Sequence, residues 1–252
     1  MLFDLRSGKR RRVVQVVYGG LAALFLLGFV FFGIGGEVNL DPAELFGGGG
    51  GSTSGQFEDQ VDDAENRLEA NPKDEKALRD LAQYRYLSGQ AQLEQDEETL
   101  QPVVTEESRS EFEAAVEAWD RYLKTDPQKP DVATAGQVVS AYFFLNDAGG
   151  AARAQRIVAE ANPSTGTYSN LAFYLYADGQ IGPGDEAAAQ AVAQAEPSER
   201  AAIRKELETL SRQAAKQKKA LEKLPEGGAG GEGALEDPFG GLGPSGTPPP
   251  AP

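Results

Sequence analysis

The chain has 252 residues, of which 40% are hydrophobic and 25% charged, and its formal net charge is −15. This length accommodates one folded domain of ordinary size with compositionally biased segments at both ends. The sequence contains no cysteine and no histidine, which excludes thiol and imidazole nucleophiles, Ser-His-Asp triads, zinc sites of the usual ligand type and structural disulfides.

The charge is unevenly distributed along the chain. Residues 1–36 hold five basic side chains and one acidic side chain, a net charge of +4, whereas the other 216 residues hold 19 basic and 38 acidic side chains, a net charge of −19. A surface this acidic repels phosphate groups. We therefore expect no nucleic-acid binding, and no extended contact between the soluble part and anionic lipid.

The first predicted element is a transmembrane helix at residues 13–36. The 22 residues from Val13 to Ile34 contain no ionisable side chain except Tyr18, and at ~1.5 Å per residue they span ~33 Å, about one hydrocarbon core. The alternative is a cleaved signal peptide. A signal peptide typically has an apolar run of only ~7 to 15 residues, followed by an Ala-x-Ala cleavage site. The apolar run of this chain is longer, and residues 33–40 contain no such site. The basic run at 9–12 predicts a single-pass protein of the cytoplasmic membrane, with residues 1–12 inside and the rest outside.

Two biased segments flank the central region. Residues 37–56 are rich in glycine and are predicted to form a flexible linker, and residues 225–252 are rich in Gly and Pro and are predicted to be disordered. Each contains a short apolar island, at Leu40–Phe46 and at Leu235–Leu242. These islands are candidate docking peptides for a partner or for a neighbouring copy of the chain, so a homo-oligomer is one alternative.

The central region has the pattern of successive helices. Ala, Leu, Val and Tyr recur at spacings of three and four residues. Proline ends four of the expected helices, because it cannot continue a helix, at Pro72, Pro127, Pro163 and Pro197. Three other helices end in residues that tolerate the left-handed conformation, Gly89, Asn146 and Gly179.

The helices form an internal repeat. Residues 57–72 and 112–127 match at Phe, Glu, Val, Leu and Pro, and matching first helices place Leu81, Val138 and Leu171 at spacings that fit a period near 34 with one insertion. The insertion, between Gln90 and Phe112, is predicted to be a lengthened helix and an acidic loop. Ser108 and Glu111 are predicted to form a capping box for the following helix.

This pattern resembles the tetratricopeptide repeat, a pair of antiparallel helices with a W-x2-L-G-x2-Y, A-x3-F, P signature. The matching residues are Leu78, Leu81, Ala82, Ala115, Trp119 and Pro127 in one copy, Ala135, Val138, Val139, Tyr142, Ala151 and Pro163 in a second, and Tyr168, Leu171, Ala172 and Pro197 in a third. Arg85 and Gln155 stand where the family prefers aromatic residues.

The resemblance implies an all-α fold, a TPR-like superhelix of antiparallel helix pairs behind one N-terminal transmembrane helix. Residues 57–197 would hold the repeats, as a half repeat at 57–72 and copies at about 73–127, 128–163 and 164–197. Residues 198–224 carry Ile203, Leu207 and Leu210 on one stripe and are predicted to form a capping helix.

No pattern in the sequence indicates catalysis. The acidic insertion lacks the ligand spacing of a calcium loop, paired carboxylates are common in any acidic helix, and the glycine tract at 47–51 precedes no Gly-Lys-Ser. We therefore predict no catalytic residue, no cofactor and no metal site, and expect that the protein is not an enzyme.

The resemblance also implies a binding site. In this family the first helix of each repeat contributes to a concave groove that binds peptides. The corresponding residues are Arg79, Gln83, Tyr86, Ser140, Phe143, Phe144, Ser169, Phe173 and Tyr176. The alternative is that several of these side chains pack in the core. Gln83 and Ser140 replace the Lys and Asn clamp that related repeats use for a C-terminal carboxylate, so a partner with an acidic C-terminus is not expected.

These expectations point to a membrane-anchored scaffold for protein–protein interactions on the extracytoplasmic face. A protein or peptide would be its partner. The alternative is an ancillary, chaperone-like subunit of the Sec translocon or of envelope-assembly machinery, because single-pass proteins with an external tetratricopeptide-like domain are similar to this architecture.

Overall fold

The computed structural model describes residues 57–96 and 102–221. The predicted membrane helix, the glycine linker, the tail and both apolar islands lie outside the described residues. Within the described part, no helix combines the length and the hydrophobicity that a membrane crossing needs.

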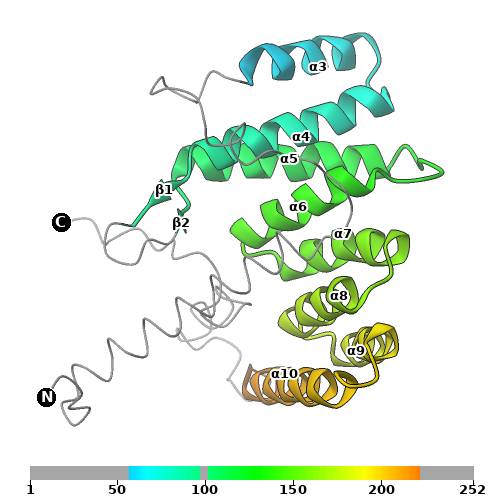
Figure 1. Ribbon diagram of the computed structural model, residues 1–252. Helices are drawn as coiled ribbons and strands as arrows, with labels where there is room; N and C mark the ends of the chain where they lie inside the picture. Colours follow the sequence, from blue (N-terminus) through cyan, green and yellow to red (C-terminus); the bar gives the residue numbers. More distant parts are fainter. Residues whose placement is uncertain (1–56, 97–101, 222–252) are drawn as a thin grey trace, which may run out of the picture.

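The described residues are mostly helical, as the sequence predicts (Figure 1). They form eight helices, α3 (Glu58–Ala70), α4 (Glu75–Ala91), α5 (Glu106–Leu123), α6 (Val132–Phe144), α7 (Ala148–Ala161), α8 (Thr165–Ala177), α9 (Ile181–Gln194) and α10 (Arg200–Leu221). Two short antiparallel strands, β1 (Glu94–Gln95) and β2 (Pro102–Val103), lie at the tip of the hairpin between α4 and α5.

The helices pack as consecutive antiparallel pairs. The first helices of the pairs, α4, α6 and α8, pack on the second helices, α5, α7 and α9, and each second helix also contacts the following element. Helix α3 packs on α4 at one end of the array, and α10 packs on α8 and α9 at the other. The last two pairs repeat closely, because α7 begins at Ala148 and α9 begins 33 residues later at Ile181.

The helix ends follow the predicted turn chemistry with one exception. The four helices before the prolines end two to four residues upstream of them, at Ala70, Leu123, Ala161 and Gln194. Asn146 and Gly179 adopt φ of 62° and 70°, which confirms their left-handed conformation. The prediction for Gly89 is wrong. It lies inside α4, where a Cβ would stand 2.7 Å from the Phe112 ring, so the position needs a small residue.

The insertion lengthens both helices of the first pair, where one lengthened helix was predicted, and adds the unpredicted strands. The predicted capping box is wrong, because α5 begins before Ser108. The hydroxyl of Thr105 accepts a hydrogen bond from the Ser108 amide (3.0 Å), and the Ser108 hydroxyl donates to the Thr105 carbonyl (3.0 Å). Ser108 is buried within the first turn of the helix.

Small residues allow close helix crossings along the array. The alanines that match the repeat signature, Ala82, Ala115, Ala151 and Ala172, are fully buried, where a small side chain lets two helices approach closely. Two glycines lie beneath tyrosine rings, since a Cβ on Gly150 would be 2.3 Å from Tyr142 and one on Gly184 would be 2.4 Å from Tyr176. The larger side chains Trp119, Phe112 and Leu78 fill the remaining interior.

Candidate protein-binding surface

The first helices carry a row of partly exposed side chains opposite their core faces. The row contains Gln83 on α4, Phe143 on α6, and Ser169 and Phe173 on α8, all half-buried. On each helix these residues lie about half a turn from a core residue such as Leu78, Val138 or Leu171. The row holds one aromatic side chain on α6 and an aromatic and a small polar side chain on α8.

Three of the predicted groove aromatics instead lie in the interior. Tyr86, Phe144 and Tyr176 are 3%, 4% and 5% exposed. A side chain this buried offers almost no surface to a partner, so we leave the three out of the proposed contact surface. For these three residues the alternative given by the sequence analysis holds, because their side chains pack in the core.

The lengthened first pair explains two of these burials. Phe112, on the longer α5, stacks on Phe144 with ring centroids 4.9 Å apart and lies 6.1 Å from the Tyr86 ring. With Ala115 and Ala141 they form a core cluster separate from the main one. Burial raises the pKa of the Tyr86 phenol, so this side chain stays neutral at physiological pH.

The remaining predicted residues keep part of their surface exposed or lie at the edge of the core. Arg79, Gln83, Phe143 and Phe173 are half-buried, and Ser140 is 9% exposed. Arg79 is already engaged in an ion pair with Asp80 (2.9 Å). The binding role of these residues stays a prediction.

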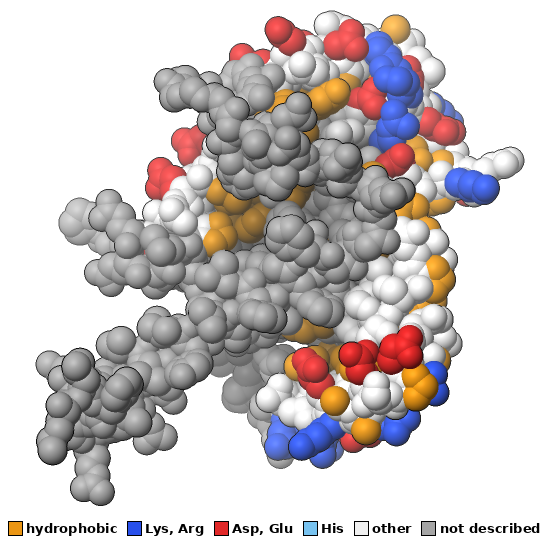
Figure 2. All heavy atoms as spheres, viewed as in Figure 1, with side chains coloured by type: hydrophobic (Ala, Val, Ile, Leu, Met, Phe, Trp, Pro, Cys, Tyr) orange, Lys and Arg blue, Asp and Glu red, His pale blue; other side chains and the backbone are white. Residues whose placement is uncertain are grey.

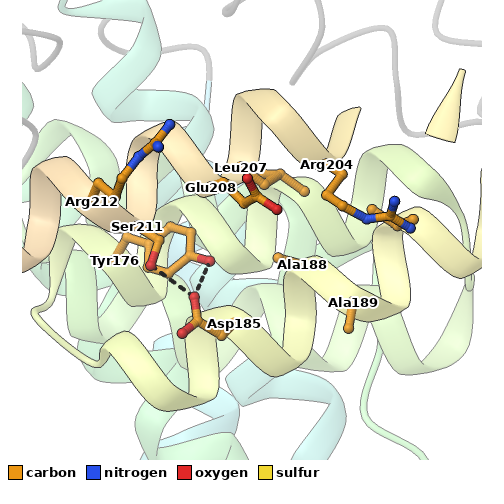
Figure 3. A pocket seen from close by; sticks show the side chains of 10 residues that line it. Tyr176, Asp185, Ala188, Ala189, Arg204, Leu207, Glu208, Ser211 and Arg212 are labelled. Carbon is orange, nitrogen blue, oxygen red and sulfur yellow. Dashed lines mark hydrogen bonds between the residues drawn. The ribbon is translucent and has the colours of Figure 1, made fainter. Parts of the chain in front are cut away.

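A cleft of about 590 Å³ lies between α9 and α10, and the sequence did not reveal it (Figure 3). Asp185 of α9 joins three helices at its edge, because its Oδ1 atom accepts hydrogen bonds from the Tyr176 hydroxyl (2.8 Å) and the Ser211 hydroxyl (2.8 Å). Burial and this bond raise the pKa of the Tyr176 phenol, which therefore remains a hydrogen-bond donor at neutral pH.

The cleft has an apolar lining and a charged rim. Ala188, Val192 and Leu207 supply apolar surface. Arg204 and Arg212 stand toward opposite ends of the cleft (Figure 3). This volume lies within the ~300 to 1,000 Å³ of common ligand sites, and the lining suits an apolar side chain flanked by polar or acidic groups.

The charged side chains near the other end of the array have a structural role. Arg67 pairs with Asp74 (2.9 Å), and Arg85 bridges Glu65 (2.6 Å) and Glu111 (3.2 Å), which ties α3, α4 and α5 together. In the described part of the chain, no group of three or more acidic side chains is arranged to hold a metal ion.

Comparison of the chain with protein-family models, curated proteins and solved structures finds no match. The arrangement of helix pairs and the chemistry of the surface therefore carry the functional argument.

Proposed function

We propose that the chain is a membrane-anchored scaffold whose TPR-like helical array binds a protein or peptide segment outside the cytoplasmic membrane. The observation that carries this proposal is the succession of antiparallel helix pairs, in which α4, α6 and α8 carry aligned rows of partly exposed residues. Stacked helix pairs create extended surfaces of the kind that bind peptides and other proteins.

The chemistry of the surface supports a peptide over a small polar ligand. Phe143 and Phe173 contribute aromatic area next to polar or small neighbours, and the cleft between α9 and α10 adds an apolar lining with arginines at its rim. Aromatic and arginine side chains are the residues that most often dominate binding energy at protein interfaces.

Site-specific photocross-linking in native membranes tests the proposal. A photoreactive residue at Gln83 or Ser169 on the first helices, or at Ala188 in the cleft, should form adducts with the same protein partner. Glu113, exposed on the second helix α5, is the matched control and should give no such adduct. Equal adducts from all four positions, or adducts from Glu113 alone, would contradict a partner that uses this surface.

The identity of the adduct separates the scaffold from its alternative. Adducts with translocon subunits and with emerging chains would assign the protein to the chaperone class, whereas one folded envelope protein would support a scaffold.

The predicted anchor and orientation are tested separately. Because the basic run at 9–12 should hold the N-terminus inside, protease added to intact protoplasts should remove the domain at residues 57–224. Complete protection of the domain, with cleavage after lysis, would show that the orientation is wrong.

A further inference from the structure

The two terminal helices of the array carry opposite charge. Helix α3 has six acidic residues and one basic residue, and α10 has seven basic residues and two acidic ones. They lie at opposite ends of the domain (Figure 1). In Figure 2, acidic side chains follow the upper edge over α3 beside a group of basic ones, and basic side chains follow the lower edge over α10 beneath a row of acidic ones.

The charges lie on the outward faces of both helices. On α3, the core face carries Val61, Ala64 and Leu68, and the exposed Asp59, Asp62 and Asp63 lie on the opposite face by helical spacing. On α10, Leu207 is buried, and by helical spacing the opposite face carries the exposed basic side chains Lys205, Lys216 and Lys219.

Capping a helical array does not require this separation of sign. A terminal helix needs a polar outer face to stay soluble, which mixed charges also provide. Every ion pair among the described residues involves side chains between Glu65 and Glu111, and none includes a residue of α10. Among the described residues, the basic side chains of α10 therefore form no ion pair with a carboxylate of the same chain.

Each end of the array also has one helix of an incomplete pair, and the two unpaired helices are of different kinds. Residues 57–72 match 112–127 in sequence, and α3 packs on α4 as α5 packs on α6, so α3 is a second helix without its first. Helix α10 packs on α8 and α9 as α6 packs on α4 and α5, so it is a first helix without its second. Placing α10 of one copy beside α3 of the next would complete a helix pair.

We propose that the occupant of the basic face of α10 is the acidic face of α3 in a second copy of this chain. The contact is head to tail and leaves one free end on each copy, so it can extend to further copies. Because it rests on exposed charges, it is weak and depends on salt concentration. An anionic lipid surface fits less well, since residues 57–199 carry 28 acidic and 11 basic side chains and would be repelled by it.

Charge reversal on the full chain in a mild neutral detergent tests this contact by sedimentation velocity. Self-association should appear at about 0.01 M salt, where charges act over ~30 Å, and disappear at about 1 M salt, where they act over ~3 Å. D62K/D63K changes the net charge of α3 from −5 to −1, and K205E/K216E changes that of α10 from +5 to +1, so each variant removes most of the charge at one end. Each variant alone should lose roughly tenfold or more in association constant, since two charges at the contact become repulsive and little net attraction remains.

An equimolar mixture of the two variants should associate again, because the unchanged basic α10 of one variant can then face the unchanged acidic α3 of the other. The control E113K/E117K changes net charge as D62K/D63K does, on exposed positions of α5, and should associate like the wild type. Circular dichroism checks that each variant is folded. A wild type that stays monomeric at low salt, a mixture that fails to associate, or a control that loses association equally would overturn the proposal. Binding of a monomeric wild type to anionic vesicles, lost in K205E/K216E, would instead assign the face to lipid.

Discussion

The first helix pair and the last one use the same antiparallel packing but fill it differently. In the α4/α5 pair, the Phe112 ring enters a cluster with Tyr86 and Phe144, and ion pairs bind α3, α4 and α5 at the surface. In the α8/α9 pair, α9 is rich in alanine, and the Tyr176 ring lies against Gly184. The packing of the first pair therefore depends on large side chains and ion pairs, whereas the packing of the last pair depends on small residues that let the helices approach closely.

The comparison predicts its largest effect at Phe112. This side chain is fully buried, and Phe112→Ala should lower the free energy of unfolding by ~3 to 5 kcal/mol through lost burial and a residual cavity. Equilibrium denaturation monitored by circular dichroism measures the change. The neighbouring exposed Glu113 provides the control, and Glu113→Ala should change the free energy by no more than ~0.5 kcal/mol. A small loss at Phe112 would mean that the aromatic cluster does not hold the first pair.

The last pair should respond to an added methyl group instead. Gly184→Ala would place a Cβ 2.4 Å from the Tyr176 ring, and we expect a loss of ~1 to 3 kcal/mol from this overpacking. Gly182 lies in the same helix with no neighbour within 4 Å of an added Cβ, so Gly182→Ala should be neutral or stabilising by up to ~1 kcal/mol. Thermal denaturation of the two variants decides the point, and equal effects would show that the Tyr176 contact does not matter.

The same contrast explains what the sequence could predict. Prolines and left-handed residues act locally, so Pro72, Asn146 and Gly179 mark the helix ends correctly. The crossing alanines were predictable because a helical repeat needs small residues at fixed spacings.

The candidate site was harder to predict because it depends on distant packing. Tyr86 and Phe144 are buried by Phe112, which reaches them from a pair that the insertion has lengthened, so the spacing of the repeat does not reveal their environment. The cleft arises where the alanine-rich α9 meets α10. Because α9 is so rich in alanine, its sequence does not indicate which of its residues face α8 and α10. The hydrogen bonds of Asp185 with Tyr176 and Ser211 could therefore not be predicted.

A smaller effect should distinguish the pairs by pH, since the ion pairs of the described residues lie within the first pair and α3. Asp74 is the N-cap of α4, and the hydrogen bond from the Ala77 amide, together with that from Arg67, lowers the pKa of its carboxyl group. A pKa lower in the folded state than in the unfolded state means that the carboxylate stabilises the fold above the unfolded pKa. This contribution is lost as the pH falls through the lowered folded pKa.

Asp74→Asn keeps a capping side chain but removes the charge. In denaturation experiments at neutral pH the variant should be less stable than the wild type, and the difference should shrink as the pH falls below the ordinary aspartate value of ~3.9. A difference that stays constant down to the lowest pH at which the chain folds would show that the charge of Asp74 does not stabilise the first pair.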